Sequence, residues 1–292
     1  MSTQVKSAFE RTVDEGVERL HRSTPVLLAT GMVGGLDVGL GVFALLLVHH
    51  GTGSPELGAL AFSIGFVALS LANSELFTEN FLIPVSAAVA KKARLRDIGR
   101  LWTGSLVSNL VGGWVVMAVV MEGFPGLDAV ARSTAEHYVT SGIGLGSFCT
   151  AILGGMVITL MTWMEQTTES VPAKLVAAVA AAFLLAAGSL NHVIVMSLES
   201  FAALQAGATF GYTTWAGLAG WALLGNLAGG LTLVTLLRLV QVGGEKLRAE
   251  RERPESEPRT ETAGSDSSKS PSGTQLDAAV DRLVEVTDRM SR

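Results

Sequence analysis

The sequence has little of the chemistry on which enzymes and disulfide-bonded domains depend. Its 292 residues contain a single cysteine, which excludes an internal disulfide. Only 16% of the residues are charged and only 6% are aromatic. It shows no cluster with metal-ligand spacing, no glycine-rich nucleotide loop and no nucleophile–base pair. We therefore expect no enzyme activity, no cofactor, no metal and no nucleic-acid partner.

Apolar residues are abundant instead. They make up 49% of the chain, and the mean hydropathy is +0.44 although the last fifty residues are polar. A helix needs about 20 mostly apolar residues to cross the hydrocarbon of a bilayer. Thirty-three glycines suit close helix packing in lipid, because small residues let backbones approach. The sequence predicts an all-α membrane protein whose six spans lie at roughly 26–48, 57–89, 101–121, 143–164, 172–199 and 212–240.

The basic residues predict the orientation of these spans. Of the 21 lysines and arginines, only Arg132 falls in a loop that six spans place outside. The loop between the second and third spans is strongly basic, from Lys91 to Arg100. Cytoplasmic loops carry an excess of Lys and Arg. We expect a multi-pass protein of the cell (inner) membrane, with the lipid bilayer around it and both termini in the cytoplasm.

Two spans carry polar residues at their centres. The segment ANSELFTEN occupies residues 72–80, and GSLNHV occupies residues 188–193. Non-helical backbone at membrane depth is tolerated only where protein buries it or where it lines a cavity. Paired interruptions in the two halves of a transporter point to its binding site. The second and fifth helices are therefore predicted to be broken.

The two halves also share a motif. NLVGG begins at Asn109 and NLAGG begins at Asn226, 117 positions later, while Thr78 and His192 in the breaks are 114 apart. Similar offsets predict two three-helix repeats. Because three is odd, the second repeat must be inverted in the membrane. Asn109 and Asn226 are expected to support the structure.

Three segments together resemble the formate/nitrite transporter family: ELFT at 75–78, GSLNH at 188–192 and GNLAGG at 225–230. The resemblance covers roughly residues 20–242. It implies an aquaporin-like fold that assembles as a homopentamer. It also implies that each protomer carries its own pore for small monovalent anions such as formate or nitrite.

The resemblance also implies roles for particular residues. Thr78 matches the threonine of the first break, His192 matches the single pore histidine, and Leu76 matches an apolar residue that narrows the pore. Lys174 matches a basic residue at the start of the fifth helix, where it either draws anions inward or extends to the membrane interface. Apolar constrictions are implied on either side of the pore centre, by Phe62 and Phe66 and by Leu185. Three positions depart from the common pattern and bear on the substrate: Asn191, Met196 and Thr150.

An imidazole between apolar constrictions suits the transport of a weak acid. Removing an isolated charge from water is costly, so a weak acid tends to take up a proton instead. His192 can donate or relay that proton, since histidine titrates near neutrality. Thr78 can orient the ring, although it can also cap the following half-helix. Glu75 is expected to hold N–H groups of the break rather than substrate.

Two other functions remain open from the sequence. One is a pore for neutral solutes of the glycerol type, against which the absence of an NPA motif and the presence of His192 argue. The other is a membrane assembly protein that kept the fold and lost transport, which the departures at Asn191 and Met196 allow. The chain is expected to divide into an amphipathic N-terminal helix (1–24), a channel domain (25–242), a disordered linker (243–274) and a short C-terminal helix (275–292).

Overall fold

The computed structural model describes residues 3–253, and within that range every regular element is a helix. The short helix predicted at 275–292 and most of the predicted linker lie outside the described residues. Five helices are long and apolar enough to cross a membrane, which confirms the expectation of an all-helical membrane protein. They are α2 (Thr24–Thr52), α3 (Pro55–Ala72), α5 (Leu95–Gly123), α7 (Leu145–Gln166) and a continuous stretch from Tyr212 to Val242.

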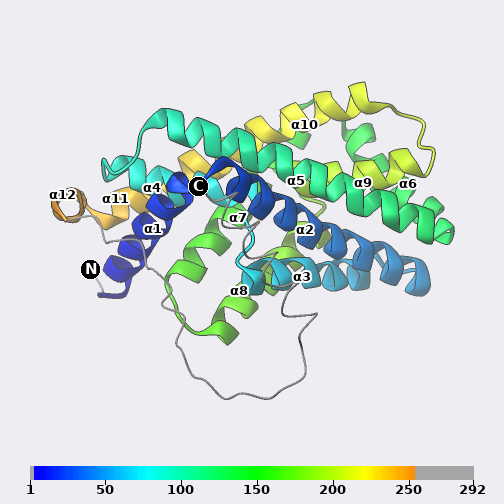
Figure 1. Cartoon of the computed structure of the whole chain (residues 1–292). Helices are drawn as coiled ribbons and strands as arrows, with labels where there is room; N and C mark the ends of the chain where they lie inside the picture. The colour runs from blue at the N-terminus through cyan, green and yellow to red at the C-terminus, as the bar shows by residue number, and fades with distance from the viewer. Residues whose placement is uncertain (1–2, 254–292) are drawn as a thin grey trace, which may run out of the picture.

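The last of these stretches is not a uniform helix. It begins as α10 (Tyr212–Leu227), widens into a π-helix over Ala228–Leu236 and ends as α11 (Leu237–Val242). Figure 1 shows α5 and α10 in the upper part of the view, with α2 and α3 below them, and α10 packs mainly against α7. The backbones pack closely where glycine faces a neighbouring helix.

Shorter apolar helices occupy the two segments with polar centres. The predicted second span consists of α3, the 3₁₀ helix Phe77–Phe81 and α4 (Ile83–Val89). The predicted fifth span consists of α8 (Val171–Ala187) and α9 (Val193–Gln205). Each segment is therefore interrupted near its middle. We call residues 73–76 the first break and residues 188–192 the second break.

Three further helices lie outside the long spans. They are α1 (Thr3–His21), α6 (Asp128–Ser141), which follows the short turn Pro125–Leu127, and α12 (Gly244–Glu252). The apolar face of α1 buries Phe9, Val13 and Leu20 against α4 and its neighbours. The helix α12 falls within the segment for which the sequence predicts a disordered linker. Its Glu250 pairs with Lys92, and this contact holds the start of the tail against the bundle.

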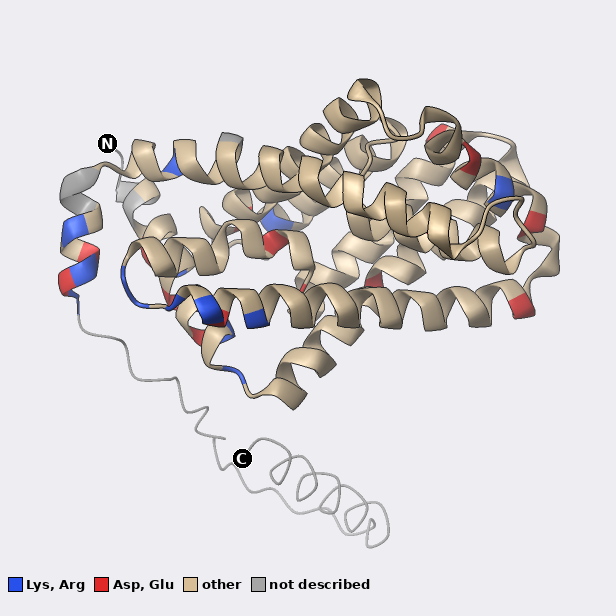
Figure 2. Ribbon diagram, turned by 90° about the horizontal axis from the view of Figure 1, so that it is seen from above, with Lys and Arg blue, Asp and Glu red and all other residues tan. Residues whose placement is uncertain are grey.

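The two ends of the bundle differ in charge. Figure 1 shows α1 and α12 at one end, and α6 at the other. Figure 2 shows most of the Lys and Arg ribbon at the end that carries α1, whereas the α6 end is mainly acidic. Between the spans at the α6 end, the acidic residues are Glu56, Glu122, Asp128 and Glu136, with Arg132 as the basic one.

The sides of the bundle expose large apolar side chains. They include Leu60, Val119, Val176, Leu224 and Val240, each more than half exposed. Many large apolar side chains exposed on the long helices indicate faces that contact lipid or another protein. It suits a chain whose long helices lie in a bilayer.

Candidate functional site

The first break follows from the sequence that ends α3. Asn73 adopts a left-handed conformation with φ 51°, which asparagine tolerates better than most residues, and the helix stops at Ala72. Residues 74–76 have no regular structure, and the chain then turns into the 3₁₀ helix. Glu75, Leu76 and Thr78 have no exposed surface in this segment.

The second break ends α8 in a similar way. Ser189 has a positive φ of 46°, and regular helix resumes only at Val193. His192 is the N-cap of α9, and its Nδ1 accepts a hydrogen bond from the N–H of Val195 at 3.3 Å. Like Thr78, His192 is fully buried.

The two breaks meet at one hydrogen bond. Thr78 Oγ1 and His192 Nε2 lie 2.7 Å apart, with 114 positions of sequence between them. Because Nδ1 accepts from Val195, the proton of the neutral imidazole belongs on Nε2, which then donates to Thr78 Oγ1. Among the described residues, Thr78 Oγ1 has no second partner. The O–H of Thr78 can therefore donate a hydrogen bond to a small ligand.

A buried asparagine holds the first break in place. Asn109, on α5, accepts the N–H of Phe77 at its Oδ1 over 2.8 Å. Its Nδ2 donates to the carbonyl of Gly31 on α2 at 2.6 Å and to the carbonyl of Glu75 at 2.9 Å. One side chain thus satisfies backbone groups that the break removes from regular helix.

Asn226 does the same for the second break. From α10 it accepts the N–H of Val193 at 2.8 Å, and its Nδ2 donates to the carbonyl of Ala151 on α7 at 2.7 Å and to that of Asn191 at 2.9 Å. We call the bonds of Asn109 and of Asn226 the two asparagine clamps. Each clamp joins the same three kinds of group: the N–H after the break, a carbonyl within it and a carbonyl of the adjacent long helix.

Glycine lets each clamp approach its neighbouring helix. A Cβ atom at Gly35 would clash with the backbone carbonyl of Asn109, and a Cβ atom at Gly155 would clash with that of Asn226. Both glycines are helical, so the requirement here is space rather than unusual backbone angles. The equivalence of the two clamps therefore extends to the helices behind them.

The apolar residues that the family resemblance singles out are all buried. The rings of Phe62 and Phe66 pack with centroids 5.4 Å apart and are fully buried on α3. Leu76 lies in the first break with no exposed surface, and Leu185 is 1% exposed in the last turn of α8, just before the second break. All four belong to one core cluster.

Glu75 binds side chains rather than the N–H groups expected from the sequence. Its carboxylate accepts from the Asn80 amide at 2.8 Å and from the Arg22 guanidinium at 3.0 Å. The break needs no carboxylate for its N–H groups, because Asn109 already accepts the N–H of Phe77. Lys174 lies half-buried in the first turn of α8, and its ammonium forms no ion pair with a described residue.

The sequence analysis did not identify the contact between α1 and the first break. Arg19 of α1 reaches into the bundle and pairs with Glu79 at 3.1 Å, with side chains 8% and 4% exposed. It also pairs with Glu15 of its own helix at 2.6 Å, and it donates to Asn80 at 3.1 Å. The only sequence signal was the i,i+4 spacing of Glu15 and Arg19, which indicates a pair within the helix.

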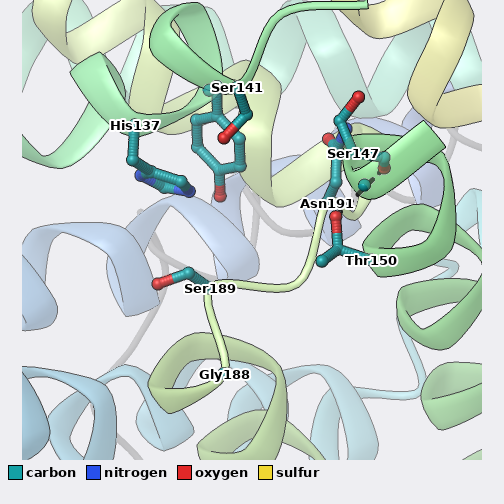
Figure 3. A pocket seen from close by; sticks show the side chains of 9 residues that line it. His137, Ser141, Ser147, Thr150, Gly188, Ser189 and Asn191 are labelled. Carbon is teal, nitrogen blue, oxygen red and sulfur yellow. Dashed lines mark hydrogen bonds between the residues drawn. The ribbon is translucent and has the colours of Figure 1, made fainter. Parts of the chain in front are cut away.

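A pocket of about 410 Å³ opens next to the second break, at the α6 end. Figure 3 shows His137 of α6 on one side of it, with Asn191 and Thr150 on the other and Ser189 below. Asn191 is 5% exposed, and its Oδ1 has no hydrogen-bond partner. The pocket therefore ends on the residue that directly precedes His192. In the part of the chain that the structure describes, no group of histidine, cysteine and carboxylate side chains is arranged to bind a metal.

Known proteins resemble the chain over most of its length. The profile described as formate/nitrite transporter matches residues 6–240. The inner membrane protein YfdC of Escherichia coli (strain K12) is 25% identical over 266 residues, which cover 83% of this chain and 80% of that protein. A solved structure described as an FNT family ion channel has a TM-score of 0.74 at 18% identity and covers 80% of this chain and 98% of its own. Another, described as a pentameric formate channel with formate bound, has a TM-score of 0.62 at 17% identity, with 75% of this chain and 97% of that chain covered.

Proposed function

Because the chain belongs to the formate/nitrite transporter family, we propose that it conducts small monovalent anions of the formate or nitrite type through a pore in each protomer. The observation that carries this proposal is the hydrogen bond between Thr78 and His192, which joins the two breaks in a buried position. The proposed pore passes Thr78 and His192, and Asn191 lies beside His192.

The architecture proposed with this function is six spans in two inverted three-helix repeats, with the second and fifth helices broken. The matching asparagine clamps support it, because inverted repeats place equivalent residues at equivalent contacts. We further propose a homopentamer in the cell membrane with cytoplasmic termini. The structural similarity to a pentameric formate channel supports the pentamer. The basic residues at the α1 end support cytoplasmic termini.

The site supplies a proton donor where an anion would lose water. Formate entering an apolar passage is stabilised by protonation, because an isolated charge is costly there. His192 Nε2–H and the Thr78 hydroxyl provide hydrogen-bond donors at one point of that passage. A proton that passes from Nε2 to the anion is replaced on the ring from water, so the imidazole ends neutral as it began. The N-terminus of α9 adds the positive end of a helix dipole at His192, which favours an anion before the proton is transferred.

The residues around the pair take supporting roles in this proposal. Phe62, Phe66 and Leu76 narrow the pore on one side of His192, and Leu185 narrows it on the other. Lys174 attracts anions toward the inner mouth by its charge. Glu75, Asn109 and Asn226 keep the breaks in shape by the contacts described above.

Uptake by proteoliposomes tests this function. Labelled formate, nitrite and lactate are supplied outside at about pH 5 and about pH 7.5, a range across which histidine titrates. We expect selective, pH-dependent uptake by the wild type and at least about a tenfold loss in His192→Ala, since a positioned proton donor contributes about 100-fold or more to a reaction. His50→Ala, at the exposed end of α2, is the matched control and should behave as the wild type.

The same experiment identifies the alternatives. Glycerol uptake that does not depend on pH would contradict the proposal and show that the protein is a pore for neutral solutes. No uptake of any solute by a correctly folded pentamer would leave a membrane assembly protein. Equal anion uptake by wild type and His192→Ala would remove the role of the histidine.

A further inference from the structure

A second histidine faces the pocket at the α6 end. The Nδ1 of His137 donates to the carbonyl of Thr134 at 2.6 Å, one turn back on α6. Because Nδ1 holds the proton, Nε2 of the neutral ring is an acceptor, and this buried atom has no partner. Figure 3 shows the imidazole directed across the pocket.

The opposite wall offers the complementary group. The Asn191 side chain is buried, its Oδ1 is unpaired, and its Nδ2 donates to no group among residues 3–253. Two of the nearby hydroxyls are already used, because Ser147 donates to the carbonyl of Gly142 and Thr150 donates to the carbonyl of Ser147. The other two lining serines, Ser141 and Ser189, are exposed and can bond to water. Buried polar groups are normally paired, so two unpaired ones on one cavity need a ligand or water to satisfy them. A half-turn of the Asn191 amide exchanges its oxygen and nitrogen without changing its shape, and it places the N–H at the unpaired position, where it can donate to a ligand.

We propose that this pocket binds the transported weak acid, with one oxygen of its carboxyl-like group on His137 Nε2 and the other on the Asn191 amide. The proposal rests on the function proposed above and adds a second site to it. Its ligand class is a small weak acid and its conjugate anion, of which formic acid and formate are the simplest pair.

The same two contacts serve both ionisation states of the ligand. The neutral acid donates its O–H to Nε2 and accepts from the Asn191 amide with its other oxygen. When the proton moves from that acid oxygen to Nε2, the products are the carboxylate and the imidazolium, held by the same pair of atoms. One proton is transferred, no other bond changes, and the ligand does not need to reorient. The pocket can therefore interconvert the acid and the anion beside the second break.

The surroundings of His137 leave it neutral in the empty pocket. Burial lowers the pKa of His137 below its usual value, and its bond to the Thr134 carbonyl only partly offsets this. The neighbouring Tyr138, whose ring lies 3.7 Å away between centroids, donates its hydroxyl to Glu199 of α9 at 2.6 Å. Burial raises the pKa of Tyr138, so it stays protonated.

No other ionisable group in the described part of the chain pairs with His137. Within α6, Arg132 donates to the carbonyl of Ala206, Glu136 is exposed, and Asp128 lies nine positions before His137 at the start of the helix. The helices that pack against α6 bring further ionisable residues, but none of them forms a hydrogen bond or ion pair with His137: Asp37, His49, His50, Cys149, Glu165, Glu199 and Tyr212. A bound anion would therefore be the main partner of the imidazolium.

Nuclear magnetic resonance of the histidine rings tests the inference in the intact protein. The chain has five histidines, and the His137 signal is assigned by its absence in His137→Gln. Formate should shift this signal saturably and raise the pH at which it titrates, because the anion prefers the protonated ring. Asn191→Leu should weaken the formate effect about tenfold, the cost of one hydrogen bond. Glycerol should have no effect, and Thr140→Ala, exposed on α6, should match the wild type.

The two proposals fail separately. A His137 signal that ignores formate, or that responds equally to glycerol or in Asn191→Leu, overturns the pocket while anion uptake still stands. A response of His137 without anion uptake by the wild type overturns the proposed function and keeps the pocket. The His192→Ala variant should lose uptake and retain the His137 response. Since the titration is measured on the wild type, a poorly folded variant does not prevent the result.

Discussion

The hydroxyl of Thr78 and the Nε2 of His192 lie 2.7 Å apart, so the two interruptions of the bundle share one buried hydrogen bond. Neither residue has exposed surface, and each belongs to a different half of the chain. The orientation of the imidazole depends on two contacts, this one and the N–H of Val195.

The first prediction concerns Thr78. Thr78→Val keeps the shape of the side chain and removes its hydroxyl. We expect formate uptake to fall about five- to tenfold, because a buried hydrogen bond contributes about 1–1.5 kcal/mol. Thr30→Val is the control, since Thr30 Oγ1 bonds only the carbonyl of Val26 on its own helix. Unchanged uptake in Thr78→Val would show that the hydroxyl does not assist transport.

The second prediction concerns the asparagine clamps. Asn109→Ala and Asn226→Ala should each lower the free energy of unfolding by about 2–4 kcal/mol, because each leaves several buried backbone groups without a partner. Unfolding in mixed detergent micelles measures this, with the exposed Gln241→Ala as a control. Similar losses are expected for the two asparagines. A large loss for one and none for the other would contradict their equivalence.

The third prediction concerns the ion pair between α1 and the first break. Arg19→Met should lower the free energy of unfolding by about 3–5 kcal/mol, since it leaves the buried Glu79 carboxylate unpaired. Adding Glu79→Gln should recover part of that loss, because the uncompensated charge is gone. Arg96→Met is the control: Arg96 is 78% exposed, and its pair with Asp97 should contribute less than about 1 kcal/mol. Strictly additive losses would show that the pair is not coupled.

The fourth prediction concerns the docking of α12 at low pH. Burial opposes ionisation of Glu250, but bonds from Arg253 and Lys92 outweigh it and hold the pKa of Glu250 below its usual value. A carboxyl whose pKa is lower in the folded state stabilises that state above its unfolded pKa, and the stabilisation is lost as the pH falls. Amide exchange in residues 244–252, corrected for its intrinsic pH dependence, should therefore accelerate below about pH 4.5. In Glu250→Gln the protection should be weak at every pH.

Much of the architecture was predictable because bilayer thickness constrains it. The apolar runs that predict α2, α5 and α7 need no knowledge of their neighbours, and a polar segment such as 72–80 stands out within such a run. The repeated motif at Asn109 and Asn226 can be read directly from the sequence. The three hydrogen bonds that each asparagine forms could not be predicted, because they depend on how the break packs against the neighbouring helices.

Contacts between distant polar residues were not predictable where neither the repeat nor the family resemblance links them. Arg19 and Glu79 are 60 positions apart, and nothing in either segment indicates the other. The pocket next to His137 was not predictable either. His137 lies in a polar helix at the end of the bundle, so composition describes it as one more surface residue, and only the packing of α6 on α9 turns it toward Asn191.

The asparagine clamps have a consequence for how the chain can be divided. Every bond of the Asn109 clamp lies between Gly31 and Asn109, and every bond of the Asn226 clamp lies between Ala151 and Asn226. A cut in the connection that contains α6 would therefore leave both sets whole, one on each fragment. Each fragment would carry a preformed bend, and rejoining the two would require helix packing and the single threonine–imidazole contact rather than the refolding of either bend.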